Sequence, residues 1–211
     1  VREEVALEVR DRRPLIRVLH RYPEKSVLLE VYLITGFAGT AHGREGQPVA
    51  WVPLSDIHRY RLPDADRPIL RALDLPSRYL ITPDPGSDPS RLAERLGAAV
   101  RGGDLVQLRA PSLASEALRT LAGAAVRLCR DRGARLLLNG EPGLAQALDA
   151  DGVHLNGRRL ADAARRPLPA HRLVAASCHD ASELRRAERI GEDFAVLSPV
   201  LPTPSHPGAG T

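Results

Sequence analysis

The sequence predicts an α/β protein in two parts, residues 1–76 and 77–211. Three observations support this division. Before about residue 76 the chain has the pattern of strands followed by one helix. After it, six short apolar runs alternate in strict order with helical patterns, as in a parallel sheet whose strands are joined by helices. At the junction, the strand Tyr79–Thr82 runs into Pro83, Asp84, Pro85 and Gly86, which favour a turn.

The composition indicates a soluble globular protein. Hydrophobic residues make up 43% of the chain and charged residues 27%, both ordinary values. No apolar run approaches the roughly 18 residues that a membrane helix needs, so we expect no membrane partner. The two cysteines, Cys129 and Cys178, form no disulfide framework, which favours a cytoplasmic location.

The basic residues are dispersed among acidic ones, and aromatic residues are only 3% of the chain. We therefore expect no stable nucleic-acid partner, because single-strand binding needs an aromatic stacking surface. Scattered arginines suit phosphate-bearing small molecules. There is no methionine, even at position 1, which suggests an internal piece of a longer protein.

In the first part, apolar positions 1, 5 and 9 predict a helix over Val1–Val9. Alternation predicts strands, and turn residues separate them. The remaining elements are expected in this order: a strand at Leu15–His20, a strand at Ser26–Phe37 with Val27, Leu29, Val31 and Leu33 on one side, a Gly-rich loop at Gly36–Gln47, a short strand at Val49–Val52, a helical turn at Pro53–Ile57, and a helix that starts at Arg67-Pro68 after Asp66 and runs through Ile69–Leu75.

Glu3 and Glu4 are either ordinary exposed acids or part of a site for a hard cation, because adjacent carboxylates can hold Mg²⁺ against a diphosphate. The run V-R-E-E-V-A-L at Val1–Leu7 fits the end of the Nudix box, except that Ala6 replaces a glycine. G-R-E-G-Q-P-V-A-W at Gly43–Trp51 closely resembles the corresponding loop of MutT-type Nudix hydrolases.

This resemblance implies the C-terminal part of a Nudix α/β/α sandwich. It implies that Glu3, Glu4 and Glu45 bind Mg²⁺, and that the substrate is a nucleoside triphosphate such as 8-oxo-dGTP. Asp66 falls where MutT enzymes use an asparagine to bind the oxidised guanine. An ionised carboxylate only accepts hydrogen bonds, whereas an amide also donates. The first part of the box would lie before Val1, so we expect this chain not to hydrolyse nucleotides by itself.

In the second part, the six predicted strands are uninterrupted and short, and most end in a polar residue. This favours an incomplete TIM-type (β/α)8 barrel over a doubly wound sheet. The strands are expected at Tyr79–Thr82, Leu105–Arg109, Leu136–Leu138, Gly152–Leu155, Leu173–Ser177 and Phe194–Ser198, and the helices at Asp88–Gly102, Ser112–Gly133, Pro142–Leu148, Leu160–Arg165 and Ala181–Ile190.

In a barrel, the polar residues at the carboxyl ends of the strands converge on one face. These residues are Gln107, Arg109, Asn139, His154, Ser177, His179 and Thr203. Each taken singly has an ordinary structural interpretation; His154, for example, suits a packed or capping role. Five strands that each end in a polar group together predict a ligand site.

The motifs V-Q-L-R, L-N, A-D-G-V-H-L, S-x-H and S-P-V-L-P-T, in this order, resemble the thiamine-phosphate synthase/TenI family over Arg78–Thr211. The resemblance implies substrate contacts at the matching positions. Gln107 and Arg109 would bind a pyrimidine diphosphate, Asn139 and Ser177 would contact substrate, and Thr203 and Ser205 would bind a thiazole phosphate. His179 matches the proton-shuttling histidine of TenI-type thiazole tautomerases, and imidazole suits that role near neutral pH.

The chain departs from the synthases where they bind metal. Gly140 and Arg159 replace two Mg²⁺-binding aspartates, and Pro111 replaces a lysine. Three hypotheses follow. The protein is a Mg²⁺-dependent nucleotide hydrolase fused to a synthase/TenI-like domain, or the barrel carries the activity as a thiazole-phosphate tautomerase or synthase-like enzyme, or the barrel is a non-catalytic ligand-binding module.

Overall fold

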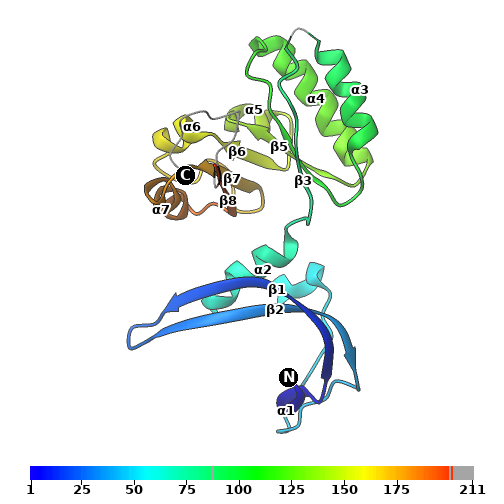
Figure 1. Ribbon diagram of the computed structural model, residues 1–211, viewed down its shortest axis with the longest axis vertical. Coiled ribbons are helices and arrows are strands. Elements are labelled where there is room, and N and C mark those ends of the chain that lie inside the picture. Colours follow the sequence, from blue (N-terminus) through cyan, green and yellow to red (C-terminus); the bar gives the residue numbers. More distant parts are fainter. Residues whose placement is uncertain (87, 200, 202–211) are drawn as a thin grey trace. The chain divides into compact units, whose positions relative to one another are not determined.

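The computed structural model describes residues 1–86, 88–199 and 201. The chain forms two compact units, Val1–Leu75 and Pro76–Thr211 (Figure 1). Each unit has its own secondary structure and is described by itself below.

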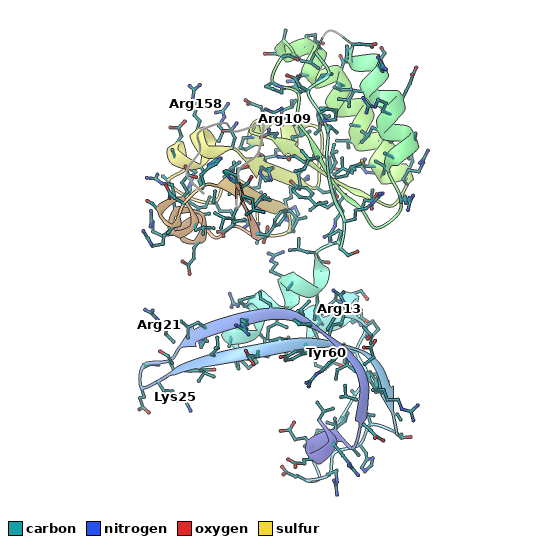
Figure 2. All side chains as sticks on the ribbon, in the orientation of Figure 1. Arg13, Arg21, Lys25, Tyr60, Arg109 and Arg158 are labelled. Carbon is teal, nitrogen blue, oxygen red and sulfur yellow. The ribbon has the colours of Figure 1, made fainter. Side chains whose placement is uncertain are left out.

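The first unit is built on a long antiparallel β-hairpin (Figure 1). Its elements are α1 (Arg2–Val5), β1 (Glu8–Arg21), β2 (Ser26–Ala38), the 3-10 helices η1 (Leu54–Arg59) and η2 (Asp64–Asp66), and α2 (Arg67–Asp74). Helix α2 packs against β1. Strand β2 alternates between exposed and half-buried residues, and Val27, Leu29, Val31 and Leu33 are all on the half-buried side, as predicted. The basic side chains Arg13, Arg21 and Lys25 extend from the hairpin (Figure 2).

Two sequence predictions in the first unit are wrong. The predicted helix Val1–Val9 ends at Val5, because Ala6 adopts a left-handed conformation with φ of 59° and the chain then enters β1. The predicted strand Val49–Val52 has no regular structure. It lies between Pro48 and Pro53, which lack the N–H groups that a sheet requires. Trp51 is 71% exposed and stacks on Phe37 of β2 at 5.5 Å between ring centroids.

The second unit is a six-stranded parallel sheet in the order β3-β4-β5-β6-β7-β8. The strands are β3 (Tyr79–Ile81), β4 (Leu105–Leu108), β5 (Arg135–Asn139), β6 (Gly152–Leu155), β7 (Leu173–Cys178) and β8 (Phe194–Leu197). The helices are α3 (Pro89–Ala99), α4 (Ser115–Asp131), α5 (Pro142–Ala147), α6 (Gly157–Asp162) and α7 (Ala181–Ile190). Each strand pairs with the next along the chain, which makes a curled half-barrel and not a doubly wound sheet. The six predicted strands are confirmed.

The apolar core of the second unit lies between the sheet and its helices. It includes Val106, Leu136, Val153 and Val174, which are completely buried. Each of these side chains comes from a different strand, so the same alternating face of the sheet is covered throughout. Within the described residues, no helix is long and apolar enough to cross a membrane.

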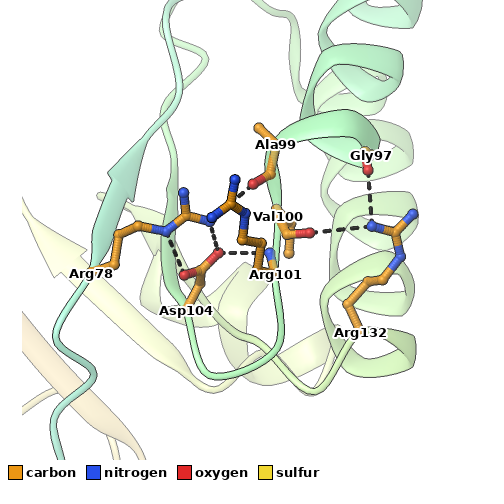
Figure 3. A network of polar contacts seen from close by, with 7 residues as sticks. All are labelled: Arg78, Gly97, Ala99, Val100, Arg101, Asp104 and Arg132. Carbon is orange, nitrogen blue, oxygen red and sulfur yellow. Dashed lines mark hydrogen bonds and ion pairs between the residues drawn. The ribbon is translucent and has the colours of Figure 1, made fainter.

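Carboxylates fasten the amino-terminal ends of the strands. Asp104, before β4, accepts hydrogen bonds from Arg78 Nε at 2.6 Å and from the Arg101 amide at 2.7 Å (Figure 3). The hydrogen bond from Arg78 is the main cause that holds the pKa of Asp104 below its usual range. Asp151 accepts from the Leu136 amide and Asp193 from the Val174 amide. In a barrel this face contributes to stability, whereas function resides at the opposite face.

Candidate functional site

The inner face of the half-barrel carries the polar side chains. Val106 and Leu108 of β4 belong to the core under the helices, so Gln107 between them faces the other side of the sheet. The same alternation places Asn139, His154 and Ser177 on the inner face, because their neighbours in β5, β6 and β7 are core residues. Gln107 and His154 are 4% and 1% exposed. Four residues of the predicted cluster therefore share the inner face of the sheet.

His154 joins opposite sides of this inner face. Its Nδ1 lies 2.8 Å from the Tyr79 hydroxyl of β3, and its Nε2 lies 2.7 Å from the Ser177 hydroxyl of β7. Burial lowers the pKa of His154 to about 4 and raises the pKa of Tyr79. At neutral pH the imidazole is therefore uncharged, and it donates through one nitrogen and accepts through the other. This arrangement fixes the Ser177 hydroxyl at the base of the site.

Strand β4 is held to β3 at the point where Arg109 leaves the sheet. The Thr82 hydroxyl accepts from the Arg109 amide at 2.9 Å and donates to the Arg109 carbonyl at 3.2 Å. Asp84 follows Thr82 and accepts from the Ser112 hydroxyl at 2.5 Å. That bond is the first cause of the lowered pKa of Asp84, and the charge of Arg109 contributes further. The backbone of Arg109 is thus fixed while its side chain stays exposed.

His179 follows β7 and is paired with the first turn of α7. One oxygen of Glu183, Oε2, lies 2.9 Å from His179 Nδ1 and also accepts from the His179 amide at 2.7 Å. An ionised carboxylate only accepts, so Nδ1 carries the proton and Nε2 of the neutral ring has a lone pair. An added Cβ on Gly157 would lie 3.9 Å from His179 Cε1, which places this pair beside the start of α6. The arrangement suits a proton acceptor with a fixed tautomer.

A cavity of about 650 Å³ opens at the carboxyl ends of β4 and β5. Its polar lining includes Glu116, Arg119, Asn139, Glu141 and Asn156. The Oδ1 atom of Asn139 is buried and has no hydrogen-bond partner among the described residues. Buried polar atoms are nearly always paired, so this unpaired oxygen is an exception in the lining of the cavity.

Gly140 and Arg159, the two positions at which the resemblance to the synthases implies Mg²⁺-binding aspartates, face each other. An added Cβ on Gly140 would lie 3.9 Å from Arg159 Cγ and 3.1 Å from Asn156 Nδ2. Gly140 has φ of 85°, a conformation that disfavours a side chain. Arg159 Nη2 lies 2.6 Å from Glu141 Oε1. A guanidinium therefore lies next to the place where the aspartates would meet, and the residues here do not fit a divalent cation.

In the first unit, the loop that carries Glu45 returns to α1. Gln47 Nε2 donates to the Glu4 carbonyl at 3.0 Å, and the Arg44 amide donates to the same oxygen at 3.0 Å. Glu4 and Glu45 line one cavity of about 580 Å³, and Glu3 is not in its lining. Asp66 precedes α2 without a side-chain cap. No group of three or more His, Cys, Asp or Glu residues that could hold a metal occurs among the residues that the structure describes.

Two predicted site residues, Thr203 and Ser205, lie outside the described residues. Sequence reasoning missed Tyr79, Thr82 and Glu183, and it also missed the polar residues that line the cavity, Glu116, Arg119, Glu141 and Asn156. A signal existed for Glu183 alone, since it stands four residues after His179 at the start of a helix. Tyr79 and His154 are 75 positions apart, so only the closure of the sheet brings them together.

The family model described as thiamine monophosphate synthase matches residues 78–211. A thiamine-phosphate synthase from Chromobacterium violaceum is 42% identical over 137 residues, covering 62% of this chain and 64% of the relative. Another from Chlorobium luteolum is 38% identical over 109 residues, covering 51% of each. The chain thus spans less than two thirds of these relatives. A solved thiamine phosphate pyrophosphorylase from Pyrococcus furiosus is 23% identical, covers 62% of this chain and 63% of that one, and has a TM-score of 0.47.

Proposed function

Because the chain belongs, over residues 78–211, to the thiamine monophosphate synthase family, we propose that its second unit binds a thiazole phosphate and catalyses its tautomerisation. The curated relatives are named as synthases. The synthase reaction joins two phosphorylated substrates, and it relies on metal-held charge that this site does not supply. Tautomerisation needs only a positioned proton carrier.

The observation that carries this proposal is the pairing of His179 with Glu183. With Nδ1 donating to the carboxylate at 2.9 Å, Nε2 is the atom that takes a proton from one position of the thiazole ring and returns it at another. The protonated ring formed in between is stabilised by the adjacent carboxylate. His154 cannot fill this role at neutral pH, because both of its nitrogens are engaged and burial disfavours its charged form.

The binding roles follow from position. Gln107, Asn139 and Ser177 present amide and hydroxyl groups on the inner face, and Arg109 supplies a permanent positive charge at its rim. Thr203 and Ser205 are retained as proposed substrate ligands on the basis of the family motif. The buried Oδ1 of Asn139 would accept from a donor on the substrate.

The direct test is to incubate the 211-residue chain with a thiazole phosphate and to monitor isomerisation of the ligand by proton NMR. We expect isomerisation. We also expect Arg109→Gln to weaken binding by about 10- to 150-fold, because one charge-assisted hydrogen bond is worth roughly 1.5–3 kcal/mol. Arg95→Gln is the matched control, since Arg95 lies on α3 beside a different cavity. Equal affinities in the two variants, or no binding at all, would count against the proposed site.

We also propose that the first unit is the C-terminal portion of a MutT-type Nudix hydrolase domain acting on nucleoside triphosphates. The supporting observation is that Glu4 and Glu45, 41 positions apart in the numbering, line one cavity. Two carboxylates at one cavity can contribute to a Mg²⁺ site that is completed by substrate phosphates.

Binding of Mn²⁺, a spectroscopic substitute for Mg²⁺, tests this second proposal. We expect weak binding by electron paramagnetic resonance that is lost in Glu4→Gln and in Glu45→Gln. Glu8→Gln, an exposed change outside the cavity lining, should leave it unchanged. We further expect no hydrolysis of 8-oxo-dGTP by this chain. Mn²⁺ binding that is indifferent to both cavity variants would refute the assignment.

A further inference from the structure

The β5–α5 turn and the start of α6 meet at the carboxyl ends of the strands. A guanidinium, and not a cluster of carboxylates, lies at this point. The Gly140 amide donates to the His154 carbonyl at 2.8 Å, which anchors the turn to β6. The Asn156 side chain accepts from the Arg159 amide at 3.0 Å and fixes the first turn of α6. Both backbones are therefore held, and Arg159 projects from a defined position.

A carboxylate cannot be restored at residue 140 without rearrangement. The backbone has φ of 85° there, and a Cβ would meet Asn156 Nδ2 at 3.1 Å, closer than nearly all real contacts of this kind. The opposite position is occupied by Arg159, whose guanidinium lies 2.6 Å from Glu141 Oε1. The positive charge at this point is therefore supplied by the Arg159 side chain and not by a bound metal ion.

We propose that the Arg159 guanidinium, oriented by Glu141, binds the phosphate of a monoester ligand and does so without a divalent metal. The choice of a thiazole phosphate as ligand rests on the proposed function. The residue proposed to bind the phosphate, Arg159, is distinct from the proposed proton carrier, His179.

The chemistry of the guanidinium favours this ligand class. Arginine keeps its charge at all physiological pH values and presents five N–H donors in a planar fork that matches phosphate oxygens. The bond to Glu141 uses one Nη2 donor, and the side chain is 45% exposed, so the remaining donors can reach a ligand. One fixed positive charge complements a monophosphate better than a diphosphate, which carries more negative charge and is usually neutralised by Mg²⁺.

The cavity beside this pair has a polar lining. Asn139, Glu141 and Asn156 line it together with Glu116 and Arg119, and Arg159 lies outside the lining. The unpartnered, buried Oδ1 of Asn139 accepts a donor from the organic part of the ligand while Arg159 binds the phosphate at the rim. Glu141 orients the guanidinium through the 2.6 Å contact between Arg159 Nη2 and Glu141 Oε1.

Calorimetric titration of the whole chain with a thiazole phosphate tests the proposal, once with Mg²⁺ and once with EDTA. We expect the two dissociation constants to agree within about twofold, and a pyrimidine diphosphate to bind more weakly than the monoester. Arg159→Gln should weaken monoester binding by about 10- to 100-fold, as expected for loss of a charge-assisted contact. Arg158→Gln is the matched control, because Arg158 is the neighbouring exposed arginine of the same helix (Figure 2) and should change binding by less than about twofold.

The outcomes separate the two proposals. Monoester binding that Mg²⁺ strengthens by about tenfold or more, or equal losses in Arg159→Gln and Arg158→Gln, would overturn the metal-free site and leave the tautomerase proposal standing. Absence of binding under both conditions would overturn both. Circular dichroism of each variant confirms that the fold is retained.

Discussion

Replacing His179 by alanine is expected to lower the rate of thiazole-phosphate tautomerisation by about 10²–10⁴-fold, the usual contribution of a positioned acid–base group. The imidazole is the proposed proton carrier, and its Nδ1 is engaged by Glu183 at 2.9 Å. Because nearly half of its side chain is exposed, truncation should leave the fold intact. The affinity for the ligand should change little, so the loss should appear in kcat and not in KM.

Glu183→Gln is the informative companion variant. An amide can still bond the ring but no longer stabilises the protonated imidazole by its charge, and it also permits the opposite tautomer. We expect a smaller loss of kcat than in His179→Ala, because the bond to Nδ1 is kept while the charge that stabilises the protonated ring is removed. A merely structural role for Glu183 would leave kcat at the value of the unaltered chain.

The effect of His179→Ala would also decide whether the second unit catalyses a reaction or only binds a ligand. If the chain binds a thiazole phosphate without converting it, and His179→Ala leaves binding unchanged, the second unit is a ligand-binding module. If turnover persists at full rate in His179→Ala, another group carries the proton and the pairing with Glu183 is only structural. Measurement of isomerisation and binding on the same samples separates these cases.

The half-barrel could be predicted from the sequence because its strands are short apolar runs separated by Gly, Pro and helical patterns. Gln107, Asn139 and Ser177 could be placed on one face because alternation within a strand is a local property. The failure at Val49–Val52 in the first unit has a local cause as well. This expected strand is a four-residue segment bounded by prolines, which lack the N–H groups that a sheet requires.

Long-range geometry could not be predicted in this way. The hydrogen bonds of His154 to Tyr79 and Ser177 depend on how tightly the sheet curls. The same holds for Glu141 and Arg159, which are adjacent in space because two loops meet at the mouth. The sequence revealed that both metal-binding aspartates are replaced, but only the structure shows that an internal ion pair stands beside their position.

Asp193→Asn is expected to destabilise the second unit by about 3 kcal/mol, the lower end of the cost of breaking a buried ion pair. The Asp193 side chain is 3% exposed, and its Oδ2 accepts from Arg166 Nη2 at 2.7 Å and from the Val174 amide at 2.8 Å. An amide keeps an acceptor for the backbone bond but leaves the charge of Arg166, whose side chain is 19% exposed, without its counterion. The amino-terminal ends of β7 and β8 should therefore loosen first.

The matched control is Asp149→Asn, which makes the same chemical change at an exposed carboxylate. Asp149 is 69% exposed and pairs with Arg130 and with Arg172, whose side chain is 17% exposed, so its loss should reduce protection much less than the loss of Asp193. Asparagine also tolerates the positive φ of 56° at this position. The sole tryptophan lies in the first unit, so amide hydrogen exchange in β7 is the measurement of choice. Equal protection in the two variants would show that burial of the Asp193 carboxylate adds nothing, because the two substitutions differ mainly in the solvent exposure of the carboxylate that they change.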